Sequence, residues 1–451
     1  MNGDSLQSRF AEALQLLLPD SASQHGSSGL CVAFSGGLDS TVLLHLAAGF
    51  ARENSTGLRA LHVNHGMQAA SDEWAKRCGD VCNGLDVPFT TIAVDVDAAG
   101  SAGPEAAARD ARYAAFAAEL NKDECLLLAQ HQDDQLETVL LQLMRGAGVR
   151  GLAAMPAVAD CGTGFLARPL LGERREVLED YARDAGLSWI DDPSNFDTEL
   201  DRNYLRHRLL PLLQERWPSA AATVSRSARW CAEADGLLTE LAEKDARGFL
   251  LGNTLALESM KGQSEARRRN LLRYLIAEAG LPMPPEARLN EALRTMLTAA
   301  ADTAPEVVWP GARLCRYRYR IYALPEEAAP PQGGMLKPGA SLDLGSGNGV
   351  LELAGAADGI CLKCPEEGLG VSYRQGGERI TPVGSAQSRS LKNLFQEYAV
   401  LPWMRERIPL LYAGDELVAV GDLWVAEGWQ AEPGEGCRLV WSGAGQVQSV
   451  W

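Results

Sequence analysis

The sequence lacks the features of membrane, secreted and disulfide-stabilised proteins. No apolar run approaches the roughly 20 residues needed to span a bilayer. Asp4 stands where a signal peptide needs a basic residue, and no apolar segment follows it. The 10 cysteines are scattered over 451 residues, which is typical of reduced thiols rather than a disulfide framework. We therefore expect a cytoplasmic protein with no membrane partner.

Metal-binding cysteine patterns are also nearly absent. Cys361 and Cys364 have the spacing of half a zinc site, but no second Cys-x-x-Cys pair or histidine-rich segment completes it. Cys78 and Cys82 are one helical turn apart, which favours one face of a helix. The sequence therefore does not predict a zinc site.

An excess of positive charge is missing as well. The net charge is −17, which is the wrong sign for a protein that neutralises nucleic-acid phosphates. Positive charge is nevertheless concentrated in residues 201–230, in residues 371–410 and in the run Arg267–Arg269. Each cluster alone is more typical of a solvated surface. Together they make an anionic partner a working hypothesis, because local charge matters more than the total.

Residues 29–150 alternate short apolar runs with amphipathic stretches. This pattern predicts strands at 30–34, 59–63, 89–96 and 124–129, and helices at about 40–51, 71–85, 104–120 and 134–144. Such alternation is typical of a parallel sheet covered by helices on both faces. Ligands of such sheets bind beyond the carboxyl ends of the strands. The polar segments Ser35–Ser40, Asn64-His65 and His131–Asp134 all follow predicted strands.

The rest of the chain indicates further domains. Residues 217–329 are rich in Ala, Leu and Arg at helical spacing, with no convincing strand from about 218 to 300, and predict a helical domain. Residues 330–349 are rich in proline and glycine and predict a linker. Strand-like runs within 350–451 predict a small C-terminal α/β domain. The expected fold class is therefore α/β, with a parallel-sheet, Rossmann-like catalytic domain over residues 1–216.

The hexapeptide Ser35-Gly36-Gly37-Leu38-Asp39-Ser40 lies between a predicted strand and a predicted helix. Its glycines let the backbone approach a phosphate closely, and the helix presents free N–H groups to that anion. Ser35 and Ser40 add hydroxyl donors, whereas Asp39 is assigned to positioning a metal ion or to capping the helix. No Gly-Lys-Ser/Thr is present, so the loop is not of the kinase or GTPase type.

A second polar group, His131–Glu137, follows the fourth predicted strand and opens a helix. Asp134 and Glu137 are spaced to lie along one helix face. Carboxylates at this edge of a sheet can hold Mg²⁺, accept a proton or bind an ammonium group. Helix capping by Asp133 is the competing interpretation. Proximity to the phosphate loop favours a functional role.

Two arginines upstream, Arg109 and Arg112, are three residues apart in a predicted helix. Guanidinium groups one turn apart can clamp a polyphosphate or a carboxylate. The same spacing is equally compatible with arginines that form salt bridges on the helix surface, and the sequence does not separate these two interpretations.

The Ser35–Ser40 loop resembles the loop of the N-type ATP pyrophosphatases, or PP-loop enzymes. These include GMP synthetase, asparagine synthetase and tRNA-modifying sulfur and lysine transferases. The resemblance implies that ATP adenylates a carbonyl oxygen, that pyrophosphate leaves, and that AMP is displaced afterwards.

A longer series of segments resembles the tRNA(Ile)-lysidine synthetase family over nearly the whole chain. Many family members carry His-His before the Asp-Asp pair, whereas the first position here is Gln130. The segments are His62–Gly66, Arg109–Tyr113, Asp133–Gln135, Arg145–Gly148, Arg168–Leu171, Asp191–Asn195, Arg202–His207, Ser390–Glu397, Pro402-Trp403 and Arg405–Pro409.

This resemblance implies a specific reaction. ATP, with Mg²⁺, adenylates the oxygen on carbon 2 of the wobble cytidine in an isoleucine tRNA with a CAU anticodon. The ε-amine of free L-lysine then attacks carbon 2 and displaces AMP. The product, lysidine, pairs with A instead of G and changes the codon read from AUG to AUA.

The candidate site residues follow from the loop, the acidic segment and the resemblance. Asp39 is expected to hold the metal ion or ATP, with the remainder of Ser35–Ser40 on the phosphates. His131, Asp134 and Glu137 are assigned to lysine binding and proton transfer. Arg109 and Arg112 are assigned to a phosphate or a carboxylate, and Arg202 and Arg206 to the lysine or the tRNA.

Two other functions remain open at this stage. A tRNA-thiolation enzyme of the same fold would usually need cysteines near the active site, and a non-catalytic tRNA-binding protein would keep the loop as a relic. The helical and C-terminal domains are expected to bind the body of the tRNA. We also consider a homodimer, although the sequence does not decide the oligomeric state.

Overall fold

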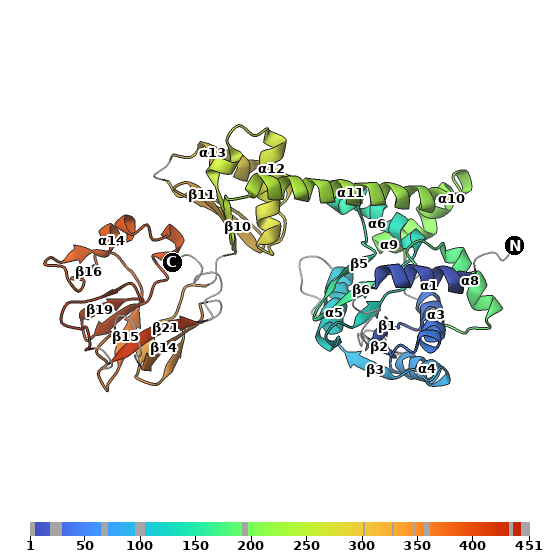
Figure 1. Ribbon diagram of the computed structural model, residues 1–451, viewed down its shortest axis with the longest axis horizontal. Coiled ribbons are helices and arrows are strands. Elements are labelled where there is room, and N and C mark those ends of the chain that lie inside the picture. Colours follow the sequence, from blue (N-terminus) through green and yellow to red (C-terminus); the bar gives the residue numbers. More distant parts are fainter. Residues whose placement is uncertain are drawn as a thin grey trace. The chain divides into compact units, whose positions relative to one another are not determined.

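The computed structural model describes residues 5–18, 29–64, 71–94, 104–191, 197–300, 303–326, 329–345, 348–355, 361–432 and 436–442. The chain divides into two compact units, Met1–Leu237 and Leu238–Trp451 (Figure 1). Within the described ranges, none of the helices is both long enough and apolar enough to cross a bilayer.

A six-stranded sheet forms the centre of the first unit. Its strands lie in the order β3-β2-β1-β4-β6-β5, and all neighbours are parallel except the edge strand β5, which is antiparallel to β6. The strands are β1 (Leu30–Ala33), β2 (Leu58–Asn64), β3 (Phe89–Ala93), β4 (Cys125–Leu127), β5 (Val158–Cys161) and β6 (Gly164–Ala167).

Helices connect these strands and extend the unit beyond the sheet. The strands and helices predicted between residues 29 and 150 are all present, each within a few residues of its predicted bounds. The helices are α1 (Leu6–Leu17), α3 (Leu38–Asn54), α4 (Ser71–Gly84), α5 (Pro104–Glu119), α6 (Gln132–Met144), α7 (Val149–Leu152), α8 (Arg175–Asp184), α9 (Asp201–Tyr204), the π-helix η2 (Leu205–Leu209), α10 (Leu210–Arg216) and α11 (Ala220–Ala246), which continues into the second unit.

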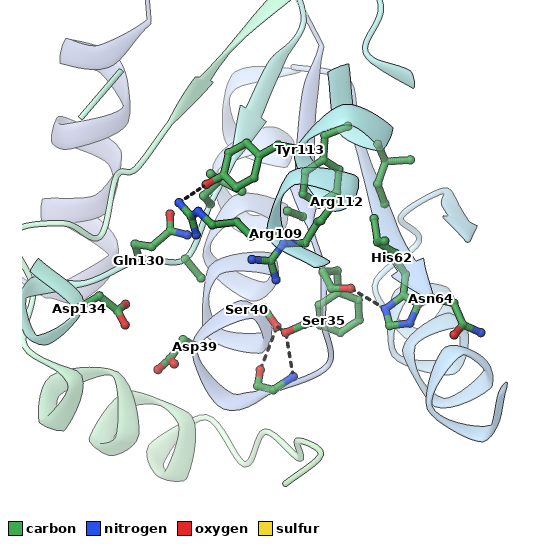
Figure 2. A pocket seen from close by; sticks show the side chains of 18 of the residues that line it. Ser35, Asp39, Ser40, His62, Asn64, Arg109, Arg112, Tyr113, Gln130 and Asp134 are labelled. Carbon is green, nitrogen blue, oxygen red and sulfur yellow. Dashed lines mark hydrogen bonds between the residues drawn. The ribbon is translucent and has the colours of Figure 1, made fainter. Parts of the chain in front are cut away.

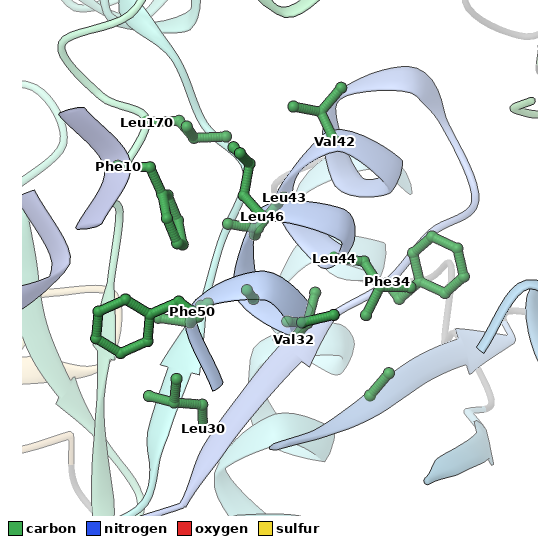
Figure 3. Packing of buried hydrophobic residues seen from close by; sticks show 14 of the residues in the cluster. Phe10, Leu30, Val32, Phe34, Val42, Leu43, Leu44, Leu46, Phe50 and Leu170 are labelled. Atoms are coloured by element: carbon green, nitrogen blue, oxygen red, sulfur yellow. The ribbon is translucent and has the colours of Figure 1, made fainter. Parts of the chain in front are cut away.

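The sheet of the first unit is buried on both faces. Successive side chains of a strand point to opposite sides, and helices cover each side. Leu30 and Val32 of β1 pack in one core with α1, α3 and α4 (Figure 3). Cys31, between them, packs in a second core with Phe116 and Leu120 of α5. Accordingly, α1, α3 and α4 lie on one side of the sheet and α5 on the other (Figure 1).

The N-terminal half of the second unit contains a sheet that the sequence did not reveal. The prediction that residues 218–300 hold no strand is wrong, because β7 (Leu250–Leu251) and β8 (Thr254–Ala256) lie there. They join β9 (Glu306–Trp309), β10 (Ala312–Tyr317) and β11 (Arg320–Pro325) in the order β7-β8-β11-β10-β9. Strands of two or three residues are too short to give an alternating pattern. The 3₁₀ turn η3 (Leu257–Met260) and helices α12 (Glu265–Glu278) and α13 (Glu286–Thr298) complete this region.

The C-terminal half of the second unit is mostly β structure. One sheet has the order β12-β15-β18-β19-β20, a second the order β13-β14-β21, and β16 pairs with β17. The elements are β12 (Gly334–Leu336), β13 (Ser341–Asp343), β14 (Val350–Gly355), β15 (Leu369–Ser372), β16 (Arg379–Ile380), β17 (Arg389–Ser390), α14 (Leu391–Glu397), η4 (Pro402–Met404), β18 (Leu410–Ala413), β19 (Glu416–Val420), β20 (Trp424–Val425) and β21 (Cys437–Ser442).

The α/β fold class is confirmed, with one difference in the segment expected to be a linker. Within residues 330–349, β12 pairs with β15 and β13 pairs with β14, so this stretch contributes to the C-terminal sheets. Its prolines, with Gly333, Gly339, Gly345 and Gly349, fall between the strands, where the sequence pattern correctly indicates turns, whereas Gly334 opens β12. The domain boundaries at 216, 329 and 349 stay predictions.

Candidate functional site

A cavity of about 440 Å³ lies at the carboxyl ends of β1, β2 and β4 (Figure 2). The sequence-predicted segments meet here although they lie far apart in the chain. His65 and Asp192–Asn195, from two of the quoted segments, lie outside the described residues. Polar residues that line the cavity are Ser35, Asp39, Ser40, His62, Asn64, Arg109, Arg112, Tyr113, Gln130, Asp134 and Arg202.

The loop after β1 turns sharply at Gly36, whose φ is +83°. A Cβ atom at this position would lie 2.7 Å from Cys78 Sγ and 3.0 Å from Ile190 Cδ1, so no other residue fits without displacing α4 or its neighbours. The N–H of Ile190 donates to the Gly36 carbonyl at 2.9 Å. The backbone of the loop is therefore held from two sides.

Gly37 is the N-cap of α3 and no side chain caps it, so the first N–H groups of the helix point toward the cavity edge without a side-chain partner. Ser40 Oγ lies 3.0 Å from Ser35 Oγ and 3.0 Å from the Gly37 carbonyl oxygen, to which it donates (Figure 2). Leu38 is buried and anchors this first turn. The arrangement fits an anion at the positive end of the helix dipole.

Asp39 lies in the first turn of α3 and is not its cap. Its Oδ1 atom is buried and accepts no hydrogen bond from any described residue. Burial favours the neutral acid, but contact with His131 and the charges of His131 and Arg175 outweigh it and lower the pKa of Asp39. A buried, ionised carboxylate oxygen without a partner fits a Mg²⁺ ion, which proteins commonly hold with one or two carboxylates plus substrate phosphates. Among the described residues, no cluster of three or more His, Cys, Asp or Glu could hold a metal without such phosphates.

His131 lies behind the two acids that reach the cavity. It is the N-cap of α6 and only 1% of its surface is exposed. Its Nε2 atom is 3.6 Å from Asp39 Oδ2 and 3.4 Å from Asp134 Oδ2. Burial alone would lower the pKa of His131, but these carboxylates together with Asp133 raise it. His131 therefore links the loop after β1 to the segment after β4.

The acids of α6 are paired with arginines that follow them by more than 60 residues. Arg206 donates to Glu137 from Nε at 2.7 Å and from Nη2 at 2.9 Å, and to Asp134 Oδ1 at 3.1 Å. Arg202 Nε lies 3.1 Å from Glu137 Oε2. Burial alone would lower the pKa of Arg206, but the Glu137 carboxylate raises it. Burial raises the pKa of Glu137 in spite of the two arginines beside it. Glu137 and Arg206 lie behind the cavity, whereas Asp134 and Arg202 line it.

Asp133 has a structural role in another helix. Its Oδ2 accepts a hydrogen bond from the backbone N–H of Arg175, at the start of α8, at 2.9 Å. Its Oδ1 accepts from Gln214 Nε2 at 3.1 Å. Asp133 therefore caps α8 rather than α6. The start of α6 is capped by Asp134, whose Oδ2 accepts from the backbone N–H of His131 at 3.0 Å.

The opposite side of the cavity carries arginines (Figure 2). Arg109 donates from Nη2 to the Tyr113 hydroxyl at 3.2 Å, and its guanidinium carbon lies 4.7 Å from the centre of that ring. Arg112 lines the same wall. Arg168, directly after β6, donates to Gln130 Oε1 at 3.0 Å and to the Tyr113 hydroxyl at 3.4 Å. We did not predict Arg168 as a site residue, although its place at the carboxyl end of a strand was a usable signal.

His62 also lines the cavity, although it is not among the site residues predicted from the sequence. It lies on β2, is 8% exposed, and its Nδ1 is 2.8 Å from the Phe34 carbonyl oxygen. Because a carbonyl only accepts, Nδ1 carries the proton and Nε2 is left as an acceptor. Burial lowers the pKa of His62, so the ring is neutral. His62 therefore gives the cavity an uncharged nitrogen acceptor.

Comparison with known proteins identifies the family. Residues 6–213 match the PP-loop domain, residues 255–322 the TilS substrate binding domain, and residues 369–441 the TilS substrate C-terminal domain. The tRNA(Ile)-lysidine synthase of Alkalilimnicola ehrlichii is 44% identical over 93% of this chain and 96% of its own length. That of Serratia proteamaculans is 42% identical over 98% of this chain and 99% of its own. The chain belongs to the tRNA(Ile)-lysidine synthase family.

A more distant likeness is to a solved structure of low sequence identity. A U34-tRNA thiolase from Methanococcus maripaludis, with its [4Fe-4S] cluster, aligns with 50% of this chain and 78% of its own at 15% identity and a TM-score of 0.41. Among the described residues of this lysidine synthase family member, no cysteine lines the cavity. Cys78, under Gly36, is buried, and burial raises its pKa to about 11. Cys361 and Cys364 belong to the other unit.

Proposed function

We propose that this chain ligates free L-lysine to carbon 2 of the wobble cytidine of an isoleucine tRNA with a CAU anticodon, as an AMP-forming carbon–nitrogen ligase. The observation that carries the proposal is one cavity that joins the PP-loop to an acidic side and an arginine side. Its relatives in the family are named for this reaction. A phosphate site, an ammonium site and an oxyanion site are what ATP and lysine together require.

ATP is the first substrate, and its phosphates occupy the loop Ser35–Ser40. The N–H groups at the start of α3, which no side chain caps, and the hydroxyl groups of Ser35 and Ser40 bind the pyrophosphate part as it leaves. The cytidine oxygen on carbon 2 attacks the α-phosphorus, and the bond from that phosphorus to pyrophosphate breaks. Asp39, with its unpartnered Oδ1, would hold Mg²⁺, which when bound neutralises charge on the phosphates.

Lysine is the second substrate, and its ammonium group fits the acidic side of the cavity. Asp134 is the acid of α6 that lines the cavity. Glu137 holds Arg206 behind the cavity and Arg202 in its lining. The ε-ammonium group must lose a proton before its nitrogen attacks carbon 2, and Asp134 is the candidate acceptor. AMP then leaves with the oxygen that it activated. An Asp134→Asn variant that makes lysidine at the normal rate would refute this assignment.

The tRNA is proposed to bind a group of six exposed arginines in the first unit. None of them makes an ion pair with a described residue, although the chain is strongly acidic overall. Other arginines of both units pair with carboxylates, as Arg183 does with Asp180 and Arg288 with Glu291. Guanidinium groups without counter-ions on an acidic protein favour a polyanion. The six, which we call the unpaired arginines, are Arg145, Arg150, Arg208, Arg216, Arg226 and Arg229.

Replacing one unpaired arginine should weaken tRNA binding without changing catalysis on bound tRNA. We expect Arg208→Ala to raise the Kd for tRNA by about threefold to tenfold, and to reduce the slope of log Kd against log salt by about one unit. Arg183→Ala, which removes an exposed arginine already paired with Asp180, is the matched control. Equal effects of the two variants would exclude the unpaired arginines as the tRNA surface.

A labelled-lysine transfer assay tests the proposed function. The purified chain, ATP, Mg²⁺ and labelled lysine are incubated with the CAU-anticodon isoleucine tRNA or with methionine tRNA, which has the same anticodon. We expect label in the isoleucine tRNA only. No transfer to either tRNA, or pyrophosphate release that does not require tRNA, would contradict the proposal. A homodimer and a cytoplasmic location stay predictions.

A further inference from the structure

Arg168 is a buried cation without a counter-ion. It is 5% exposed, and its three hydrogen bonds all go to neutral acceptors: Gln130 Oε1 at 3.0 Å, the Pro156 carbonyl at 2.7 Å and the Tyr113 hydroxyl at 3.4 Å. It forms no ion pair with a carboxylate in the described part of the chain. Burial lowers the pKa of Arg168 and the nearby Arg109 lowers it further, which shows how poorly its charge is compensated. An uncompensated buried charge is costly to the fold.

Arg168 determines which way the amide of Gln130 faces. A guanidinium has only donors, so the atom of Gln130 that contacts Arg168 Nε must be the oxygen. The NH₂ group of Gln130 has no partner among the described residues, and Gln130 lines the cavity. Gln130 therefore contributes hydrogen-bond donors to the cavity and no acceptor.

Tyr113 is constrained in the same way. Its hydroxyl oxygen accepts from Arg109 Nη2 at 3.2 Å and from Arg168 Nη2 at 3.4 Å, which uses both lone pairs. Its own hydrogen can then only be donated to a third group. Since Tyr113 lines the cavity, a ligand atom bound there can accept that hydrogen.

We propose that Arg168 is a positioning residue that fixes Gln130 and Tyr113 as hydrogen-bond donors to an oxyanion of a substrate. With Arg109 and Arg112, they form a wall of the cavity that offers donors and no acceptor. This donor wall is complementary to a carboxylate or a phosphate, and it repels an ammonium group. The inference rests on the proposed function, in which lysine supplies a carboxylate and ATP supplies phosphates.

The most informative variant is Gln130→Glu. A carboxylate at position 130 still accepts from Arg168, and it gives that buried cation a counter-ion. It also replaces the NH₂ donor that faces the cavity with an anionic oxygen. We therefore expect opposite effects: a Tm equal to or above that of the wild type, and a KM at least about tenfold higher for the substrate that carries the oxyanion.

The two possible sources of the oxyanion are separated by measuring KM for lysine and KM for ATP independently. A rise confined to lysine identifies its carboxylate as the occupant of the donor wall, and a rise confined to ATP identifies a phosphate. If both KM values stay within about threefold of the wild type, the inference is wrong. A lower Tm with unchanged KM values would mean that Gln130 has only a structural role, and this result would also overturn the inference.

Gln130→Met keeps the experiment decisive if Gln130→Glu does not fold. Methionine has a similar volume, removes the donors and adds no charge, so the same KM should rise by about twofold to tenfold. Arg168→Lys should raise that KM in the wild-type background and raise it less in the Gln130→Met background, where Arg168 can act only through Tyr113. Fully additive effects of the two changes would contradict a positioning role.

Failure of the inference can be told from failure of the proposed function. If the wild-type protein transfers no lysine to tRNA, the function is wrong and the KM values are undefined. If the wild type transfers lysine and the variants keep wild-type KM values, only the donor wall is wrong.

Discussion

The two sides of the cavity hold charge in different ways. On the acidic side, Asp134 and Glu137 are paired with Arg206, and His131 lies between Asp39 and Asp134. On the arginine side, Arg168 has only neutral partners, and Gln130 and Tyr113 turn their donors toward the cavity. On the acidic side, the carboxylates are paired with cationic side chains of the protein. On the arginine side, the positive charge of Arg168 has no carboxylate partner.

This difference indicates what each substrate group must displace when it binds. A substrate ammonium group on the acidic side must share Asp134 with Arg206, so binding there is an exchange of partners. A substrate oxyanion on the arginine side meets donors that are already oriented and need no rearrangement. We therefore expect mutations on the acidic side to affect both stability and catalysis, and mutations on the arginine side to affect mainly substrate affinity.

The largest effect is expected from Asp39→Asn. The amide keeps the size of the side chain but removes the charge beside His131 and the anionic oxygen for Mg²⁺. We expect tRNA-dependent pyrophosphate release to fall by about 10²–10³-fold. Asp80→Asn, at an exposed position on α4, is the control and should retain full activity. An Asp39→Asn protein with more than a third of wild-type activity would show that Asp39 is dispensable.

Glu137→Gln should give the largest loss of stability. Glu137 is 1% exposed and faces both Arg202 and Arg206, so the amide would leave two partly buried guanidinium groups short of an anion. We expect the free energy of unfolding to fall by about 3 kcal/mol in urea denaturation. Glu176→Gln breaks an exposed pair with Arg174 and should cost no more than about 0.5 kcal/mol. Equal losses in the two variants would mean that the acidic side is not an interdependent network.

Arg109→Lys should change affinity rather than stability. Lysine keeps the charge but cannot reproduce the planar group that lies over the Tyr113 ring and donates to its hydroxyl. We expect about a tenfold rise in one KM and a Tm within a few degrees of the wild type. A drop in Tm comparable to that of Glu137→Gln would erase the distinction between the two sides.

The smallest effect is a change with pH that depends on His131. Its pKa is raised in the folded protein, so the stability that it contributes is complete below its unfolded value, about 6.5, and is lost as pH rises through the folded value. The pKa of Asp39 is lowered in the folded protein, so the stability that Asp39 contributes is lost only as pH falls through its folded-state pKa. The stability difference between wild type and His131→Gln should therefore be larger at about pH 5.5 than at about pH 9. A stability difference that grows as pH rises would contradict the ion pairs of His131 with Asp39 and Asp134.

Local features of this protein could be predicted from the sequence, and long-range pairings could not. The loop Ser35–Ser40 and the segment His131–Glu137 were located because each follows a strand and opens a helix. The partners of Asp134 and Glu137 lie some 70 residues later, and nothing in the periodicity of the chain indicates that Arg206 reaches them. Arg168 was quoted only as part of a family segment, because its lack of a counter-ion is visible only in three dimensions.

The sheet β7-β8-β11-β10-β9 was missed for a different reason. Its first two strands have two and three residues and lie between long helices, so helical periodicity dominates any window that contains them. Tertiary pairing with β11 stabilises strands that the local sequence does not specify.

Stoichiometry in a single turnover tests the central claim most directly. Wild-type protein is mixed with isoleucine tRNA, lysine and ATP labelled in the adenosine and the γ-phosphate, and every product is counted. The account predicts one AMP, one pyrophosphate and one lysidine for each tRNA modified, and no ADP. Formation of ADP, or of AMP and pyrophosphate without incorporation of lysine into the tRNA, would contradict it.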